Sequence, residues 1–293
     1  MVLSINNISK SYGNIRALKG VSFDVPQGSV YGVLGPNGSG KTTLLGILLD
    51  VLKADGGRYH WFDNVAPHDA RKRIGSLLET PNFYHYLSGY DNLEITAGIR
   101  NTDSADRERV LRQVGLWERR NSKFQTYSLG MKQRLAIGAA LLGSPEVLLL
   151  DEPTNGLDPA GIAEIRALIK LLSSQGITIV IASHLLDEIE KVCTHVAILK
   201  HGDLLLHGHV NEVLLNEDTV EVKAENMPLL LQTLQQMPGI TAIKETDNLL
   251  MLSCGDVADT AAINSYCASR GIVLSHLLLR RKSLETRFME LTN

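Results

Sequence analysis

The sequence contains few cysteines, and their spacing excludes two common uses of this residue. The three cysteines, Cys193, Cys254 and Cys267, are odd in number and no two of them form a C-x-x-C pair. A disulfide framework needs paired cysteines, and a cysteine-based zinc site needs closely spaced ones. We therefore expect neither feature, and a reducing compartment such as the cytosol fits the sequence best.

Long apolar runs are also absent. A membrane-spanning helix needs ~20 consecutive apolar residues, whereas the longest apolar runs here, at 147–150 and 177–182, have only the length of a strand. The first residues, MVLSINNISKSYG, do not combine a basic region with a following apolar one, as a secretory signal does. The sequence thus predicts no transmembrane segment and no signal peptide.

The chain has no large excess of charge of one sign. Lys and Arg number 29 and Asp and Glu number 32, which gives a net charge of −3. Because nucleic-acid-binding proteins usually present a strongly basic face, we expect no nucleic-acid partner. Hydrophobic residues make up 44% and charged residues 21% of the chain, as in ordinary globular proteins. The 293 residues provide for about two domains at ~150 residues each.

The apolar pattern predicts an α/β core in the first part of the chain. Expected strands are 2–8, 20–25, 29–34, 147–151 and 177–182, and expected helical segments are 42–52, 85–145 and 160–174. The continuous apolar runs 147–151 and 177–182 are typical of parallel strands that are buried on both faces. Strands that alternate with helices in this way indicate a parallel sheet.

The pattern changes after about residue 210. A helix-like segment at 210–215 is followed by a strand, a helix, two strands, a helix and a strand, and the chain ends in an expected helix at 283–291. The six elements are expected at 219–224, 227–237, 240–245, 248–253, 257–270 and 272–278. This β-α-β-β-α-β order is typical of a ferredoxin-like α+β domain. We therefore predict two domains, 1–215 and 217–293.

A glycine-rich segment after the strand at 29–34 predicts a phosphate-binding loop. It matches G-x-x-x-x-G-K-[ST] and consists of Gly35, Pro36, Asn37, Gly38, Ser39, Gly40, Lys41 and Thr42, with Thr43 next. Glycines let the backbone approach phosphates closely, and the N–H groups at the start of the following helix attract anions. Lys41 is expected to reach the β- and γ-phosphates, and the Thr42 hydroxyl to bind Mg²⁺.

Two carboxylates end the apolar strand at 147–151. Asp151 is the last residue of the strand and is expected to hold Mg²⁺ beside the phosphate loop. Glu152 follows directly and is expected to polarise an attacking water, because one acid must stay with the metal while the other handles a proton. Upstream, Ser128 and Gly130 start a helix and offer a hydroxyl and N–H groups, although by themselves they indicate only an ordinary helix cap.

Together these motifs resemble the nucleotide-binding subunit of ATP-binding cassette (ABC) transporters over residues 1–215. The phosphate loop and LLLDEP match closely, and YSLGMKQR is similar to the signature motif of the family, which usually reads LSGGQ. Asn155-Gly156-Leu157-Asp158 resembles the loop after the base, and His184 resembles the switch histidine. Tyr12 resembles the aromatic residue that stacks on adenine.

The resemblance implies a P-loop ATPase fold with antiparallel β and helical subdomains beside the parallel sheet. It implies two copies of the chain that face head to tail and clamp each ATP between the phosphate loop of one and the signature of the other. The signature residues are Ser128, Leu129, Gly130 and Met131. It also implies that His184 senses the γ-phosphate, and that a separately encoded permease holds the chain at the cytoplasmic face of the membrane.

Two positions depart from the usual family pattern. Leu129 replaces the first signature glycine, and Glu79 stands where a lid-loop glutamine that binds Mg²⁺ is expected. Both departures are familiar in the branch that resembles bacitracin-resistance and lantibiotic-immunity exporters. The C-terminal extension is similar to those of drug-export subunits, so the resemblance implies antimicrobial, drug-like or lipid-like cargo.

An aromatic cluster follows the lid loop and has two interpretations. Phe83, Tyr84, Tyr86 and Tyr90 lie close together in a chain with only 5% aromatic residues. In the family that the chain resembles, this region receives a short helix of the membrane subunit, and exposed aromatic rings would suit such docking. The rings are equally suited to fill the core of the helical subdomain.

Three functions are compatible with these motifs. The first is an exporter ATPase that needs a separate membrane partner. The second is a soluble ATPase of the same type that acts in cofactor or complex assembly. The third is a non-catalytic regulatory module, which the intact Lys41, Asp151 and Glu152 disfavour.

Overall fold

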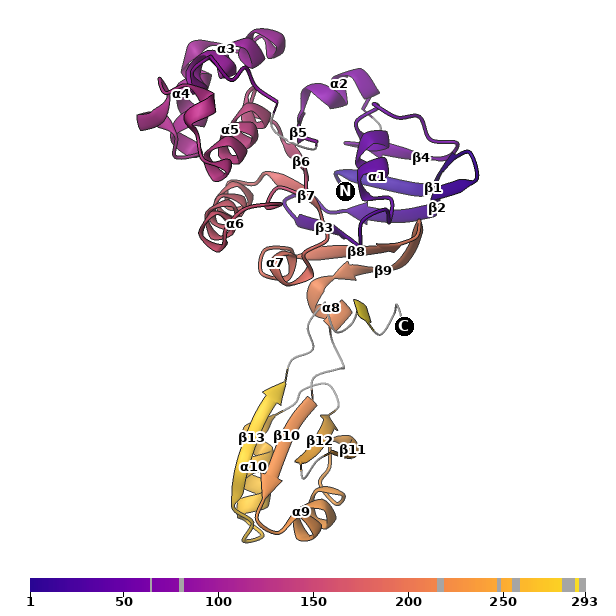
Figure 1. Cartoon of the computed structure of the whole chain (residues 1–293). Coiled ribbons are helices and arrows are strands. Elements are labelled where there is room, and N and C mark those ends of the chain that lie inside the picture. Colours follow the sequence, from indigo (N-terminus) through magenta and orange to yellow (C-terminus); the bar gives the residue numbers. More distant parts are fainter. Residues whose placement is uncertain are drawn as a thin grey trace. The chain divides into compact units, whose positions relative to one another are not determined.

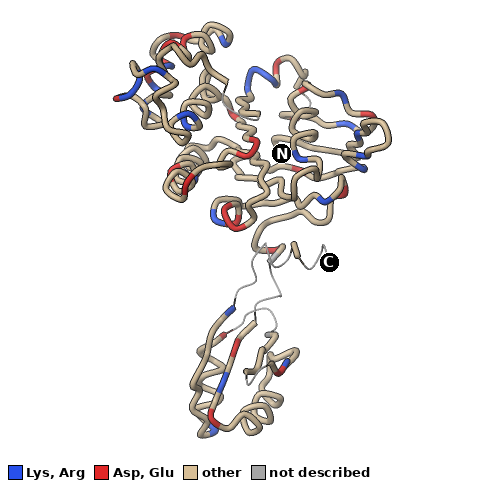
Figure 2. The backbone as a smooth tube through the Cα atoms, in the orientation of Figure 1, with Lys and Arg blue, Asp and Glu red and all other residues tan. Residues whose placement is uncertain are grey.

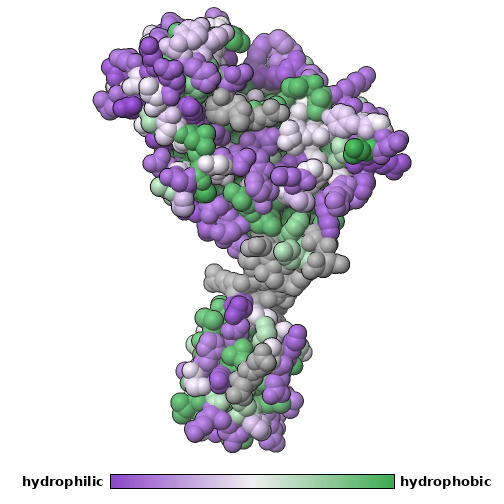
Figure 3. Space-filling model, in the orientation of Figure 1, coloured by the Kyte–Doolittle hydropathy of each residue, from purple (hydrophilic) through white to green (hydrophobic). Residues whose placement is uncertain are grey.

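The computed structural model describes residues 1–63, 65–78, 82–214, 219–246, 249–254, 259–280 and 288–289. The chain forms two compact units, Met1–Val210 and Asn211–Asn293 (Figure 1). Within the described residues, no helix is both long enough and apolar enough to cross a bilayer. In the view of Figure 3, hydrophobic residues are scattered among hydrophilic ones on both units.

The first unit is built on a central six-stranded sheet with the order β5-β6-β7-β3-β8-β9. Its strands are β3 (Val30–Leu34), β5 (Ile74–Leu77), β6 (Val147–Asp151), β7 (Thr178–Ser183), β8 (His195–Lys200) and β9 (Asp203–His209). The pairs from β5 to β8 are parallel, and β8 and β9 form an antiparallel pair. Every residue of β3, β6 and β7 is buried, which confirms the prediction of central parallel strands.

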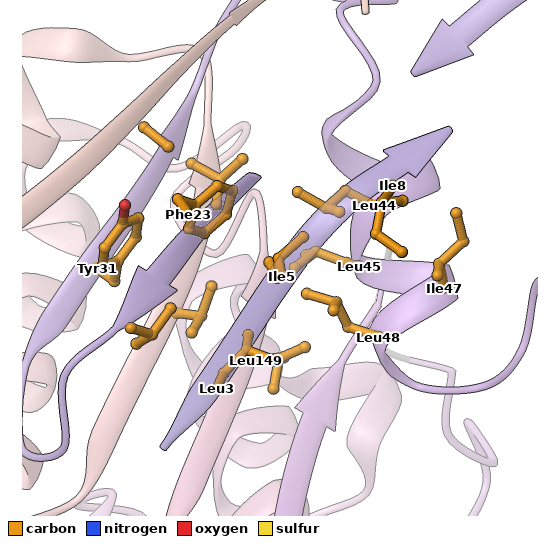
Figure 4. Packing of buried hydrophobic residues seen from close by; sticks show 14 of the residues in the cluster. Leu3, Ile5, Ile8, Phe23, Tyr31, Leu44, Leu45, Ile47, Leu48 and Leu149 are labelled. Carbon is orange, nitrogen blue, oxygen red and sulfur yellow. The ribbon is translucent and has the colours of Figure 1, made fainter. Parts of the chain in front are cut away.

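An antiparallel sheet and a helix cover one face of the central sheet. The antiparallel sheet has the order β2-β1-β4, with β1 (Leu3–Tyr12), β2 (Ile15–Val25) and β4 (Gly56–Trp61). Helix α1 (Lys41–Leu48) contributes Leu44, Leu45 and Leu48 to the same apolar core as Ile5 of β1 and Leu149 of β6 (Figure 4). The short helix α2 (Pro67–Lys72) lies between β4 and β5 in the chain.

Helices α6 (Pro159–Ser174) and α7 (Leu186–Glu190) pack against the opposite face. Successive side chains of a strand point to opposite faces of a sheet. Val180 and Ala182 of β7 accordingly belong to the core with α1, whereas Ile181 lies with Ile169 of α6 and Ile189 of α7.

A helical subdomain occupies most of residues 85–145, as the sequence predicts. It contains α3 (Gly89–Arg100), α4 (Ser104–Gln113) and α5 (Leu129–Leu141), together with the 3₁₀ turns η1 (Trp117–Arg119) and η2 (Phe124–Thr126). Each helix begins at a side-chain cap, Ser88 for α3, Asp103 for α4 and Ser128 for α5. These caps accept bonds from backbone N–H groups that the helix itself leaves open.

The second unit follows α8 (Val210–Leu214) and has the predicted β-α-β-β-α-β order. Its elements are β10 (Thr219–Ala224), α9 (Met227–Leu234), β11 (Ile240–Thr246), β12 (Leu249–Cys254), α10 (Thr260–Ala268) and β13 (Leu274–Arg280). The antiparallel sheet has the order β11-β12-β10-β13, and its core joins Val222 and Leu252 to Leu230 of α9 and Ile263 of α10. This arrangement is ferredoxin-like. Most of the expected helix 283–291 lies outside the described residues.

Several strands were not predicted, and the first two strands are longer than predicted. The strand expected at 2–8 continues to Tyr12, the strand expected at 20–25 begins at Ile15, and β4, β5, β8 and β9 were not anticipated. Strand β5 has only four residues, two of which are Gly75 and Ser76, so it gives no clear apolar signal, whereas the missed strand β9 does contain the apolar run 204–206.

Candidate functional site

Three adjacent strands of the central sheet end at the same edge. Because β6, β7 and β3 are parallel neighbours, their carboxyl ends lie together, and the loops that follow them begin at Glu152, His184 and Gly35. In open parallel sheets this edge is where ligands bind. The topology therefore brings the loop that begins at Gly35 together with two segments that lie more than 100 residues further along the chain.

The loop between β3 and α1 requires glycine at two positions. Gly35 has a φ of +155°, and a Cβ atom there would lie 2.2 Å from the Leu199 carbonyl oxygen. Gly40 has a φ of +107°, and its Cβ would lie 2.4 Å from the Ala17 carbonyl oxygen. Both positions combine a conformation that favours glycine with a close backbone approach, so the loop keeps its shape only with glycine.

The start of helix α1 is suited to an anion. No side chain caps this helix, since its N-cap residue is Gly40. Its first N–H groups and its dipole therefore present positive potential beside the loop. Ser39 is 1% exposed, and in the described part of the chain its hydroxyl has no hydrogen-bond partner. A buried polar atom without a partner is typical of a site that a ligand completes.

Lys41 is buried and held by the loop itself. Its Nζ donates to the carbonyl oxygens of Gly35, at 2.8 Å, and Pro36, at 3.2 Å, and lies 3.4 Å from Glu152 Oε1. Lys41 is only 5% exposed, and a buried ammonium needs such partners. The lysine thus lies within the glycine-rich loop and in reach of the strand-end carboxylate.

A hydrogen bond joins the phosphate loop to the end of β6. Thr42 Oγ1 donates to Asp151 Oδ2 at 2.7 Å, and Asp151 is 3% exposed. The two residues are 109 positions apart in the chain. The structure therefore brings together the two oxygen donors that the sequence singled out for a metal.

Glu152 and His184 are in direct contact. Glu152 Oε2 lies 2.8 Å from His184 Nδ1. An ionised carboxylate only accepts hydrogen bonds, so the His184 ring donates from Nδ1 in this contact. Glu152 has a φ of +48°, and its backbone N–H donates to the Ala182 carbonyl oxygen at 2.9 Å. A left-handed glutamate costs on the order of 1–3 kcal/mol and persists only where its surroundings fix it.

Tyr12 lies at the exposed end of the hairpin formed by β1 and β2. It pairs with Ile15, its side chain is 47% exposed, and Lys10 Nζ lies 5.6 Å from its ring centre. The following strand reaches the phosphate loop, because the Ala17 carbonyl oxygen borders Gly40. The ring is thus available for stacking on a flat ligand.

The signature segment begins helix α5 at the surface. Ser128 Oγ accepts a bond from the Met131 N–H at 3.2 Å, Ser128 and Leu129 are exposed, and Gly130 and Met131 are half-buried. Among the described residues, no hydrogen bond joins 128–131 to 35–43 of the same chain. Asp158 caps α6 by accepting from the Gly161 N–H at 2.8 Å.

Within the aromatic cluster, two rings pack against the helical subdomain and two are exposed. Phe83 packs edge-on against Phe124, and Arg107 lies over the Tyr90 ring. Tyr84 and Tyr86 contact each other but are 53% and 66% exposed. Glu79, the lid-loop position, lies outside the described residues.

Ser183 is a further site residue that the sequence analysis missed. It is 1% exposed, its carbonyl oxygen accepts from the Gly35 N–H at 3.3 Å, and its hydroxyl accepts from the Leu185 N–H at 3.0 Å. It therefore links the phosphate loop to the loop of His184. Its place directly before His184 was the only signal in the sequence.

Comparison with known proteins is consistent with this geometry. The family model described as "ABC transporter" matches residues 18–155. The bacitracin transport ATP-binding protein BcrA of Enterococcus faecalis is 34% identical over 299 residues, which cover 99% of this chain and 96% of BcrA. The lantibiotic transport ATP-binding protein SrtF of Streptococcus pyogenes is 38% identical over 205 residues, 70% of this chain and 90% of SrtF.

Solved structures show the same fold. The cbiO1 protein of Clostridium perfringens, part of the ABC transporter complex cbiONQ, has a TM-score of 0.67 and 27% identity. The similarity covers 81% of this chain and 96% of cbiO1. A dimeric ATP-binding cassette in a post-hydrolysis state with ADP and Pi has a TM-score of 0.62 and 26% identity, over 71% of this chain and 98% of that one.

Proposed function

The chain belongs to the ABC transporter family as an ATP-binding subunit with ATPase activity, and we propose that it powers export of an antimicrobial, drug-like or lipid-like compound through a separate membrane permease. Two similar proteins are named for bacitracin and lantibiotic transport, which supports this class of cargo. Attachment to the permease would place the chain at the cytoplasmic face of the membrane.

We propose that residues 35–43 hold the triphosphate and that Tyr12 stacks on the adenine. The uncapped start of α1 and the buried Ser39 hydroxyl support the first role. Lys41 would exchange its bonds to the Gly35 and Pro36 carbonyl oxygens for the β- and γ-phosphates, to which its charge is better matched. The exposed ring of Tyr12 supports the second role.

We propose that Thr42 and Asp151 hold Mg²⁺, with Glu79 as a third ligand that the family resemblance implies. Hydroxyl and carboxylate oxygens are the ligands that Mg²⁺ prefers, and the 2.7 Å contact between Thr42 and Asp151 shows that these oxygens already lie together. When bound, the ion would neutralise charge on the phosphate oxygens.

The contact between Glu152 and His184 is the observation that carries the proposal. Glu152 is the candidate general base for the attacking water, and the histidine at 2.8 Å fixes the orientation of its carboxylate. Lys41, at 3.4 Å from the same carboxylate, ties the base to the phosphate loop. His184 would sense the γ-phosphate next to this base.

Two further contacts of the chain belong to the proposal. Ser128, Leu129, Gly130 and Met131 are proposed to contact the ATP of a second copy in a head-to-tail dimer, since Ser128 and Leu129 are exposed and no hydrogen bond of the described residues connects the segment to its own phosphate loop. The exposed rings of Tyr84 and Tyr86 are proposed to contact the permease. Residues 217–293 are proposed to form an accessory domain.

The two glutamates at the ends of β6 provide a matched test. Glu146 directly precedes the strand and pairs with Arg73, whereas Glu152 directly follows it. In the full chain, Glu152→Gln is expected to bind ATP normally but to release phosphate at least ~10²-fold more slowly, the usual contribution of a general base. Glu146→Gln is expected to keep its turnover. Near-normal phosphate release by Glu152→Gln would remove Glu152 from the proposed role.

A further inference from the structure

Helix α7, which follows His184, cannot hold its position by itself. It has only five residues, Leu186–Glu190, and its N-cap residue Leu185 makes no side-chain cap bond. An isolated helix of this length is unstable in water, so its place depends on tertiary contacts. Because His184 lies one residue before Leu185, the position of α7 also determines where the histidine ring can lie.

One ion pair attaches α7 to α6. Arg166 of α6 donates from Nη1 to Glu188 Oε2 at 3.0 Å. Both side chains are mostly buried, at 29% and 22% exposed. The other carboxylate oxygen of Glu188 lies 3.0 Å from Lys191 Nζ, which is 43% exposed and also binds Asp187. Arg166 thus binds Glu188 across the two helices, whereas Lys191, the residue directly after α7, binds the same glutamate from its own segment.

The same ion pair lies next to the loop that carries Glu152. Arg166 and Glu188 line a small cavity together with Pro153 and Thr154, the two residues after Glu152. Ile169, Ile181 and Ile189 form its apolar part. The pair therefore borders both segments of the site, the loop after β6 and the helix after His184.

We propose that Arg166 is a positioning residue for hydrolysis, which acts through Glu188 to hold α7 and the loop after Glu152 so that His184 and Glu152 stay in contact. The inference rests on the proposed roles of these two residues. Glu152 has a left-handed backbone that its surroundings must support, and its carboxylate lies 2.8 Å from His184 Nδ1. Among the described residues, Arg166 forms no hydrogen bond or ion pair with either of them.

The test compares, in the full chain, the two residues that pair with Glu188, Arg166 and Lys191. Arg166→Met and the isosteric Glu188→Gln are expected to lower kcat for ATP hydrolysis about tenfold or more, because small misplacements of catalytic groups are costly. The KM for ATP and the calorimetric affinity are expected to change little, since Lys41 and Thr42 are not involved. Lys191→Met, which removes the exposed partner of Glu188, is the control and is expected to keep kcat.

A charge exchange distinguishes positioning from general stability. The double variant Arg166→Glu with Glu188→Arg restores an ion pair between α6 and α7 and is expected to recover most of the lost kcat. Melting temperatures show which variants fold, and Glu188→Gln decides the test if Arg166→Met does not.

The outcomes separate this inference from the function on which it rests. Normal kcat in Glu188→Gln, with Glu152→Gln inactive, would overturn the role of Arg166 and leave the proposed base in place. An equal loss in Lys191→Met, or a loss of ATP affinity that matches the loss of kcat, would likewise overturn it. If Glu152→Gln turns over normally, the proposed function fails instead.

Discussion

Both units bury charged side chains, but they do so in different surroundings. In the first unit, Lys41 and Asp151 are 5% and 3% exposed: Asp151 ends the buried strand β6, and Lys41 begins helix α1 after the loop that follows the buried strand β3. In the second unit, Glu221 lies on β10, and the basic residue Lys223 lies two positions further along the same strand (Figure 2). Its neighbours Val220 and Val222 belong to the apolar core, so Glu221 lies on the other face of the sheet.

The partners of Lys41 come from loops, whereas the partners of Glu221 come from a neighbouring strand. Lys41 is held by two backbone carbonyl oxygens and a carboxylate, all within loops at one sheet edge. Glu221 is held by Arg280 and His276 on the neighbouring strand β13. Loops with a free helix start can exchange such bonds for a ligand, whereas a pair across two strands is part of the sheet itself. The comparison supports the proposed nucleotide site in the first unit.

Matched core truncations test whether the units fold separately, and they have the largest expected effect. Leu149 of β6 and Leu252 of β12 are both fully buried, and replacing either by alanine is expected to cost about 2–5 kcal/mol of unfolding free energy. Leu149→Ala lies two residues before Asp151 and is expected to weaken ATP binding together with the first unit. Leu252→Ala is expected to destabilise the second unit and to leave ATP affinity unchanged.

Calorimetric unfolding and ATP titration of the full chain measure both effects. Equal loss of ATP affinity in the two variants would contradict separate folding of the units.

Lys41→Ala sharpens the comparison within the first unit. Removing the ammonium deletes its charge-assisted bonds to phosphate, and ATP affinity is expected to fall about 10- to 100-fold in a calorimetric titration. Lys72→Ala is the control, since Lys72 is 64% exposed and pairs only with the nearby Asp69 among the described residues. Unchanged affinity in Lys41→Ala would show that the loop does not bind the triphosphate through this lysine.

The comparison also shows what a sequence can and cannot predict. The phosphate loop, Asp151 and Glu152 follow directly from local patterns, because glycines with a lysine and acids at the end of an apolar run each have a chemical reason for their spacing. The contacts between these residues cannot be predicted from local patterns. Glu152 meets His184 because β6 and β7 pair in a register that places Asp151 opposite Ala182, and nothing in either segment states that register.

Ion pairs between helices are less predictable still. Arg166 and Glu188 are ordinary surface residue types, and their contact depends on how α6 and α7 pack on the central sheet. In the second unit, the order of the helices and strands was predictable from the sequence. The burial of Glu221 was not, because a single acid in a strand gives no sign that it will be buried.

The smallest expected effect is the pH dependence of the second unit. The hydrogen bond from Arg280, with a further contribution from His276, lowers the pKa of Glu221 below its ordinary value. A carboxylate with a lowered pKa in the folded state stabilises that state above the unfolded pKa of about 4.3, and the stabilisation is lost as the pH falls through the folded value. Glu221→Gln is therefore expected to lower the melting temperature of the second unit slightly at pH 7.

This difference should disappear in acid. As the pH falls through the lowered pKa of Glu221 in the folded state, the parent and Glu221→Gln are expected to converge, because protonation removes in the parent the charge that the variant already lacks. Glu225→Gln, just beyond the end of the same strand and exposed, is the matched control and is expected to follow the parent at every pH. A difference between parent and Glu221→Gln that stays constant with pH would mean that Glu221 stabilises the sheet by its shape and not by its charge.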